Sequence, residues 1–209
     1  MSDVALPIRR LRLEVDRTLR SRDFFARAVT GRLRAREYVD LIDQLVWLVE
    51  ALTRGEEAQL PQLGHADLAS LPAHRPRGGG AAPCPAVRLA REATGSDVIG
   101  VEDWTSDTCV AVLGTSWTSD ACESLSRSFP GTTSFLSELT DRSRMSMQRL
   151  GQRLSRAGQD AQPVYAFAEL ARGSLLGLAT YLDTSWPPPE LQLTFNGEHH
   201  EHTRAQAPA

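Results

Sequence analysis

The histidines are the side chains that could bind a metal ion or heme iron, and the 209 residues contain five of them. Three stand in the run GEHHEH, residues 197–202, together with two glutamates. Imidazole and carboxylate groups at this spacing can hold Zn²⁺ or Ni²⁺. A frayed segment loses conformational entropy when it closes on an ion, so we interpret the run as a tail with weak, adventitious affinity. The other two histidines are His65 and His74.

The cysteines are candidate nucleophiles, but the sequence gives them no activating partner. They show no CxxC spacing, and no histidine stands near Cys109 or Cys122 in the sequence. We therefore expect these two and Cys84 to be reduced, partly buried thiols of a cytoplasmic protein.

Composition and charge limit the classes of partner. The chain is 41% hydrophobic and 23% charged, which is typical of a globular domain. The formal net charge is −3, and all 23 basic residues are arginine. Because there is no basic excess to neutralise phosphates, we expect no nucleic-acid partner. The longest apolar run, Leu45–Leu52, contains Glu50 and is far shorter than the ~20 residues of a membrane span, so we expect no membrane contact.

Apolar side chains recur at helical spacing along most of the chain, and no strand pattern persists. Breaks are indicated at Gly31, at Gly55 and in the FPG turn, residues 129–131. The sequence predicts an all-α bundle of about six or seven helices. The predicted segments are residues 8–29, 35–53, 56–71, 87–94, about 103–128, 132–157 and 163–182.

The helical segments predict one domain over residues 1–186. Within it, residues 72–86 hold four prolines and three consecutive glycines, which favours a mobile surface loop. Residues 187–209 are rich in proline and polar side chains, and we expect a disordered tail there.

Six short motifs carry a resemblance to one known family, chiefly through their order along the chain. They are LRLEVDRTL (11–19), REYVDLIDQLVWLVEAL (36–52), HADLASL (65–71), VAVLGTSWTSDA (110–121), TTSFLSEL (132–139) and AFAEL (166–170). In this order they resemble the bacterial heme oxygenases that produce biliverdin. The resemblance implies a heme oxygenase-like helical bundle with heme as its cofactor. It also implies oxidation of heme to biliverdin, carbon monoxide and Fe²⁺ with dioxygen and an external electron donor.

The resemblance assigns the iron site to the first helix, where this chain departs from the family. The proximal histidine falls on Leu19, whose aliphatic side chain has no lone pair to give to iron. No histidine occurs elsewhere in the first helix. Arg12 and Arg127 match basic residues that hold the heme propionates, because a guanidinium grips a carboxylate with two hydrogen bonds.

This chain also departs from the family in the segment that matches the family's distal helix. Its glycines let the backbone approach the heme face, and they fall on Thr115, Ser119 and Asp120 in this chain. Trp117 stands between them, and its large ring could occupy space meant for the porphyrin. Two separate parts of the predicted heme site are therefore altered together.

These departures favour a divergent member that binds a tetrapyrrole or another flat apolar molecule between the first helix and the 103–128 helix, without the family's heme cleavage. Two alternatives stay open. One is an active heme oxygenase with an atypical iron ligand. The other is a non-catalytic protein-interaction module whose pocket has closed. A di-iron site needs about six inward ligands from several helices, and the helical segments offer too few histidines for it.

Overall fold

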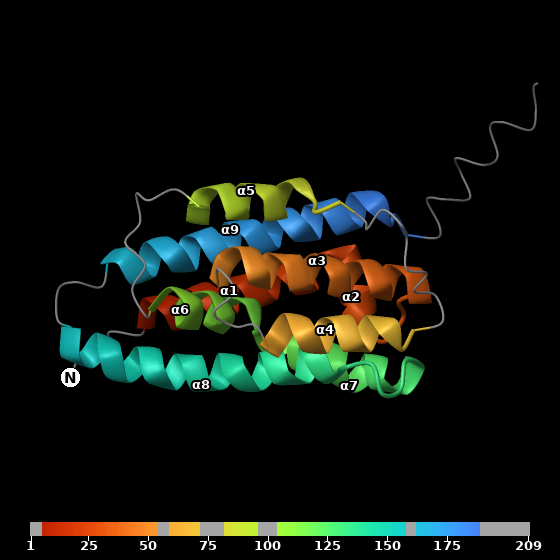
Figure 1. Cartoon of the computed structure of the whole chain (residues 1–209), viewed down its shortest axis with the longest axis horizontal. Helices are drawn as coiled ribbons and strands as arrows, with labels where there is room; N and C mark the ends of the chain where they lie inside the picture. The colour runs from red at the N-terminus through yellow and green to blue at the C-terminus, as the bar shows by residue number, and fades with distance from the viewer. Residues whose placement is uncertain (1–5, 54–58, 72–81, 96–103, 158–161, 189–209) are drawn as a thin grey trace, which may run out of the picture.

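The computed structural model describes residues 6–53, 59–71, 82–95, 104–157 and 162–188. These residues form α-helices joined by turns with no strand among them, which confirms the all-α prediction (Figure 1). The helices of this described part are α1 Leu6–Arg20, α2 Asp23–Val29, α3 Ala35–Thr53, α4 Gln59–Ala69, α5 Pro85–Gly95, α6 Trp104–Leu113, α7 Ser116–Ser128, α8 Ser134–Ala157 and α9 Gln162–Ser185.

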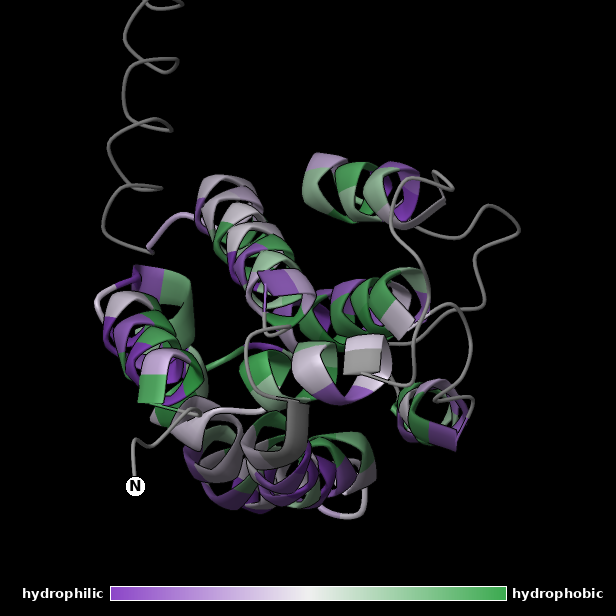
Figure 2. Cartoon of the chain, turned by 90° about the vertical axis from the view of Figure 1, so that its left-hand side faces the viewer, coloured by the Kyte–Doolittle hydropathy of each residue, from purple (hydrophilic) through white to green (hydrophobic). Residues whose placement is uncertain are grey.

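The helices run roughly side by side along the long axis of the molecule, with α7 and α8 at one edge and α5 and α9 at the other (Figure 1). α6 contacts α1, α3, α8 and α9, and its side chains from Thr105 to Leu113 are all buried. Because its whole circumference is covered, α6 forms the centre of the bundle. Outer helices carry hydrophilic residues on one side and hydrophobic residues on the other (Figure 2).

The predicted number of six or seven helices is too low, because two predicted helices are each divided in the structure. The first division separates α1 from α2. Successive residues of a helix are about 100° apart, so a straight helix that buries Val15 and Leu19 would place Phe24 on its opposite side. Phe24 is fully buried here, and the break between Arg20 and Asp23 turns the chain so that it reaches the core.

The second division separates α6 from α7 at Gly114. A Cβ atom on Gly114 would lie 2.6 Å from both the Leu139 carbonyl oxygen and the Ser143 Cβ of α8. No side chain fits at that distance, so glycine allows the carboxyl end of α6 to lie directly against α8. The predicted 103–128 helix therefore ends at Leu113 and begins again at Ser116.

The remaining boundaries differ by a few residues. α5 begins at Pro85, inside the predicted 72–86 loop, because proline fits the first turn of a helix well. Residues 72–81 of that loop, with His74, lie outside the described residues, as do residues 189–209 with the GEHHEH run. None of the described helices combines the length and the hydropathy needed to cross a bilayer.

We expect Gly114→Ala to lower the free energy of unfolding by about 1–3 kcal/mol, because the added methyl group pushes α6 from α8. The matched control is Gly173→Ala in α9, where an added Cβ meets no atom within 4 Å. There, the higher helix propensity of alanine raises stability by about 0.5–1 kcal/mol. Urea unfolding measures both changes, and equal stability of the two variants would contradict the close contact.

Candidate functional site

Leu19 and Trp117, the two positions that the resemblance turns toward a porphyrin, are both fully buried in the main hydrophobic core. The Trp117 ring packs edge-on against Phe25 of α2, with 4.9 Å between the ring centroids. Side chains with no exposed surface contact protein atoms on all sides. In this structure the two positions therefore border packed protein and not an open cleft.

The indole nitrogen of Trp117 adds a second observation at the same place. Within the described part of the chain, Trp117 Nε1 is buried without a hydrogen-bond partner. A buried donor left unpaired costs about 1–3 kcal/mol. The indole thus contributes volume to the core at this position, and its packing has to offset the cost of the unpaired nitrogen.

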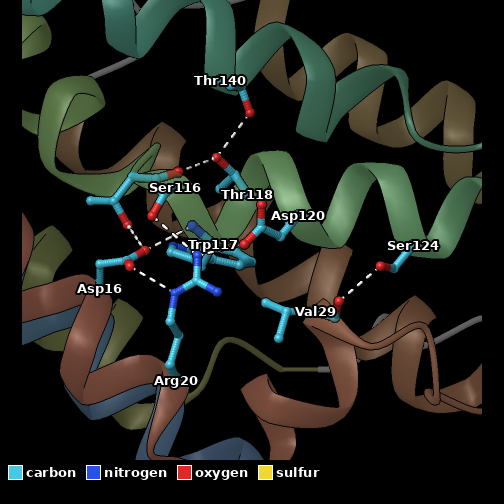
Figure 3. A network of polar contacts seen from close by, with 10 residues as sticks. Asp16, Arg20, Val29, Ser116, Trp117, Thr118, Asp120, Ser124 and Thr140 are labelled. Atoms are coloured by element: carbon cyan, nitrogen blue, oxygen red, sulfur yellow. Dashed lines mark hydrogen bonds and ion pairs between the residues drawn. The ribbon is translucent and has the colours of Figure 1, made fainter.

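A side chain of α1 caps the amino end of α7 (Figure 3). Asp16 Oδ1 accepts hydrogen bonds from the Trp117 backbone N–H at 2.8 Å and from Thr115 Oγ1 at 3.1 Å. Thr115 occupies the N-cap position of α7, but its own hydroxyl makes no capping bond. Asp16 therefore supplies the acceptor that the start of a helix requires, and its charge faces the positive end of the helix dipole.

Arg20 joins Asp16 to a second carboxylate, on α7. Its guanidinium contacts Asp16 Oδ2 at 2.7 Å and Asp120 Oδ2 at 2.6 Å (Figure 3). It also donates to Ser116 Oγ at 3.1 Å. Because Arg20 and Asp120 are partly exposed, water screens these ion pairs, and they mainly fix the orientation of the two helices.

Arg12, one helical turn before Asp16, acts on the other side of the break between α6 and α7. Its Nη2 donates to the Gly114 carbonyl oxygen and to Ser143 Oγ, both at 3.1 Å. A cation at the carboxyl end of α6 and an anion at the amino end of α7 both complement the helix dipoles. We call Arg12 and Asp16, with Gly114 and the Thr115–Trp117 turn that they contact, the Arg12–Asp16 clamp.

The environment shifts the pKa values of both clamp residues. Burial by itself raises the pKa of Asp16, but the hydrogen bonds from Arg20 and Ser116 and the charge of Arg20 outweigh burial. The pKa of Asp16 is therefore lowered from its ordinary value. Burial lowers the pKa of Arg12, and the negative charge of Asp16 partly offsets this effect.

Of the other predicted site residues, Ser119 and Asp120 lie half-buried on α7 next to the clamp, and Arg127 lies exposed in its last turn. The structure thus brings Arg12, Thr115, Trp117 and Asp120 to the contact of α1 with α6 and α7, and it leaves Arg127 apart. Asp16 and Arg20 were not among the site residues predicted from the sequence. Their spacing of four residues is that of a helical ion pair, which is the signal that could have found them.

The described residues include no group of three or more histidine, cysteine, aspartate or glutamate side chains placed to hold a metal ion. His65 Nε2 lies 3.9 Å from Glu50 Oε1 on the surface. All three cysteines are free of disulfides. Burial raises the pKa of the Cys109 thiol to about 12 and also raises the pKa of Cys84. Thiols that stay protonated at neutral pH are poor nucleophiles.

Two surface cavities lie away from Leu19 and Trp117. One, of about 290 Å³, lies between α3 and α5, and Glu50 and Arg91 are among its lining residues. The other, of about 360 Å³, lies between α1 and α9. Both volumes are near the lower end of the roughly 300–1,000 Å³ of small-molecule sites. The lining of the larger cavity is Leu6, Pro7, Ile8, Arg10, Leu11, Glu14, Tyr165, Ala168 and Glu169.

Comparison with known proteins finds no matching family model, no matching curated protein and no matching solved structure. The function of this chain must therefore be inferred from its own residues and their contacts.

We expect Asp16→Ala to lower the free energy of unfolding at neutral pH by about 1–2 kcal/mol, the usual cost of losing a helix cap. Asp16→Asn should cost less, because its amide oxygen can still accept the Trp117 N–H while the ion pair with Arg20 is lost. Urea unfolding of both variants measures this difference.

Comparison of wild type with Asp16→Asn also predicts how folding stability changes with pH. Because the pKa of Asp16 is lowered in the folded protein, its charge stabilises the fold above the unfolded value of 3.8. That stability disappears as the pH falls through the folded pKa, so wild type should lose more stability than Asp16→Asn on acidification. Parallel losses in the two proteins would show that Asp16 contributes no charge-dependent stability.

Proposed function

We propose that this chain is a non-catalytic binding module that acts through contacts of its surface with a protein partner. One observation carries the proposal: Leu19 and Trp117, where heme would have to enter, are fully buried among protein side chains. A porphyrin is large and flat, and it could enter only if this packed core opened.

The clamp supports the same proposal. In a heme-binding protein, Arg12 would be available to a propionate, whereas here its guanidinium bonds Gly114 and Ser143. Its bonds hold the end of α6 against α8, so releasing it to a ligand would leave a carbonyl oxygen without its partner. Arg12 therefore has a structural role in this proposal.

The two enzyme-like alternatives have less support. Heme iron in proteins is held by an axial histidine, cysteine, methionine or tyrosine, and α1 carries none of these four residues at Leu19 or elsewhere along its length. His65 lies on the surface of α4, 3.9 Å from Glu50. The link to heme oxygenases remains part of the proposal and rests on the order of the sequence motifs. The free thiols are consistent with a cytoplasmic location.

We expect hemin added to the purified protein to give a broad, weak Soret band that does not saturate, because no nitrogen ligand meets the iron. The measurement is an absorption titration, with iron-free protoporphyrin as the control for stacking on the surface. A sharp band that saturates at a stoichiometric amount of hemin, or growth of biliverdin absorption with a reductant, would overturn the proposal.

The proposed relation to heme oxygenases has its own test in the double variant Leu19→His/Trp117→Gly. The first change supplies an iron ligand and the second removes the large indole ring from the core, so we expect a sharp Soret band on addition of hemin. Loss of the indole costs about 3–5 kcal/mol, and circular dichroism must therefore show that the variant is folded. A folded variant without the band would mean that α1 and α7 are not the heme-facing helices of the family.

A further inference from the structure

We propose that the surface between α1 and α9 binds an acidic amphipathic helix of a partner protein. This inference rests on the proposed function as a binding module, and it names the surface and the chemistry of the partner. We call the surface the α1–α9 groove. It consists of the residues lining the 360 Å³ cavity, together with Leu13 and Arg17 on the adjoining face of α1.

The groove presents apolar side chains that the fold leaves uncovered. Leu13 is 70% exposed and Leu6 is 42% exposed, and the two are seven residues apart on the same side of α1. Leu6 also lines the cavity, together with Leu11 of α1 and Tyr165 of α9. Single exposed leucines are ordinary on protein surfaces, but two beside a cavity lined by both apolar and charged residues form a surface suited to a partner's apolar side chains.

Positive charges alternate with these leucines. Leu6, Arg10, Leu13 and Arg17 follow one another at spacings of four, three and four residues, so they form a single stripe along α1. Both arginines are exposed, and no described residue forms an ion pair or hydrogen bond with either side chain. An approaching carboxylate could pair with them without displacing an existing partner.

Arg172 partly neutralises the two carboxylates that line the groove. Arg172 of α9 contacts Glu14 at 3.4 Å and Glu169 at 2.6 Å. Because one guanidinium serves both carboxylates, their repulsion of an acidic partner is reduced. The stripe therefore favours a partner that places acidic residues opposite Arg10 and Arg17 and apolar residues opposite Leu6 and Leu13.

The shape of the surface favours a helix over a lipid bilayer. Leucines and arginines on one helical face also suit an anionic membrane. However, the cavity is a hollow between two packed helices, and a flat headgroup layer would not fill it. A helix laid along such a hollow can insert side chains at positions i, i+3, i+4 and i+7, which is the usual mode of helix-in-groove recognition.

The test uses a fluorescein-labelled synthetic peptide with leucines at i, i+3, i+4 and i+7 and glutamates between them. We expect fluorescence anisotropy to show saturable binding to the wild-type protein that weakens as salt is added. Leu13→Asp and the double variant Arg10→Glu/Arg17→Glu should each weaken binding at least about tenfold, as expected for central residues of an interface.

Matched controls lie elsewhere on the surface. Leu89→Asp changes a leucine of α5 that is 63% exposed, and Arg144→Glu changes an arginine of α8 whose side chain is 67% exposed. Both should bind the peptide as the wild type does. A peptide with lysine in place of glutamate should not bind. Circular dichroism of all variants verifies that they remain folded.

Absence of peptide binding, or equal losses in the groove variants and the controls, would overturn this inference. If the protein sedimented with phosphatidylserine vesicles and did not bind the peptide, the inference would also be overturned, in favour of a membrane surface. If only Leu89→Asp or Arg144→Glu lost binding, the groove would be wrong while the binding module stood. Stoichiometric hemin binding would instead contradict the proposed function, whatever the peptide does.

Discussion

The contact of one α1 turn with two helix ends is the interaction on which the rest of this structure depends. Arg12 holds the carboxyl end of α6, and Asp16 holds the amino end of α7. Each charge faces a helix end whose dipole has the opposite sign, so both contacts are favourable where the chain changes direction. The central helix α6 can therefore end at Leu113, with Gly114 against α8, and the Gly114 carbonyl oxygen still has a hydrogen-bond partner.

An aspartate from another helix also caps the start of two further helices. Asp67 of α4 accepts the Phe135 N–H at the start of α8, and Asp183 of α9 accepts the Phe24 N–H at the start of α2, both at 2.8 Å. Burial raises the pKa of Asp67, and the hydrogen bond from Phe135 opposes this shift. A carboxylate that caps another helix ties two elements together as it satisfies a backbone group, so these caps fix how the bundle is assembled.

This mode of assembly bears directly on function. The helices that would have to separate around a porphyrin are joined by the clamp, by Arg20 and Asp120, and by the packing of Trp117 on Phe25. In the proposed function, the closed core leaves recognition of a partner to the outer surface. The α1–α9 groove lies on the helix that also carries the clamp, so its leucines and arginines are presented by a firmly held element.

The sequence alone determined the elements whose signal is local. The apolar face from Ala35 to Thr53 predicts α3 with the same bounds as the structure, because a wide stripe at helical spacing needs no distant partner. Leu19 and Trp117 were also singled out from the sequence, but their complete burial was not predicted. The breaks at Arg20–Asp23 and at Gly114, and the acceptors Asp16 and Asp183 that support them, were decided by tertiary structure. Asp16 contacts Trp117 and Asp183 contacts Phe24 across 101 and 159 positions of the chain, and Gly114 packs against Leu139 and Ser143 of α8. Local periodicity carries no information about such contacts.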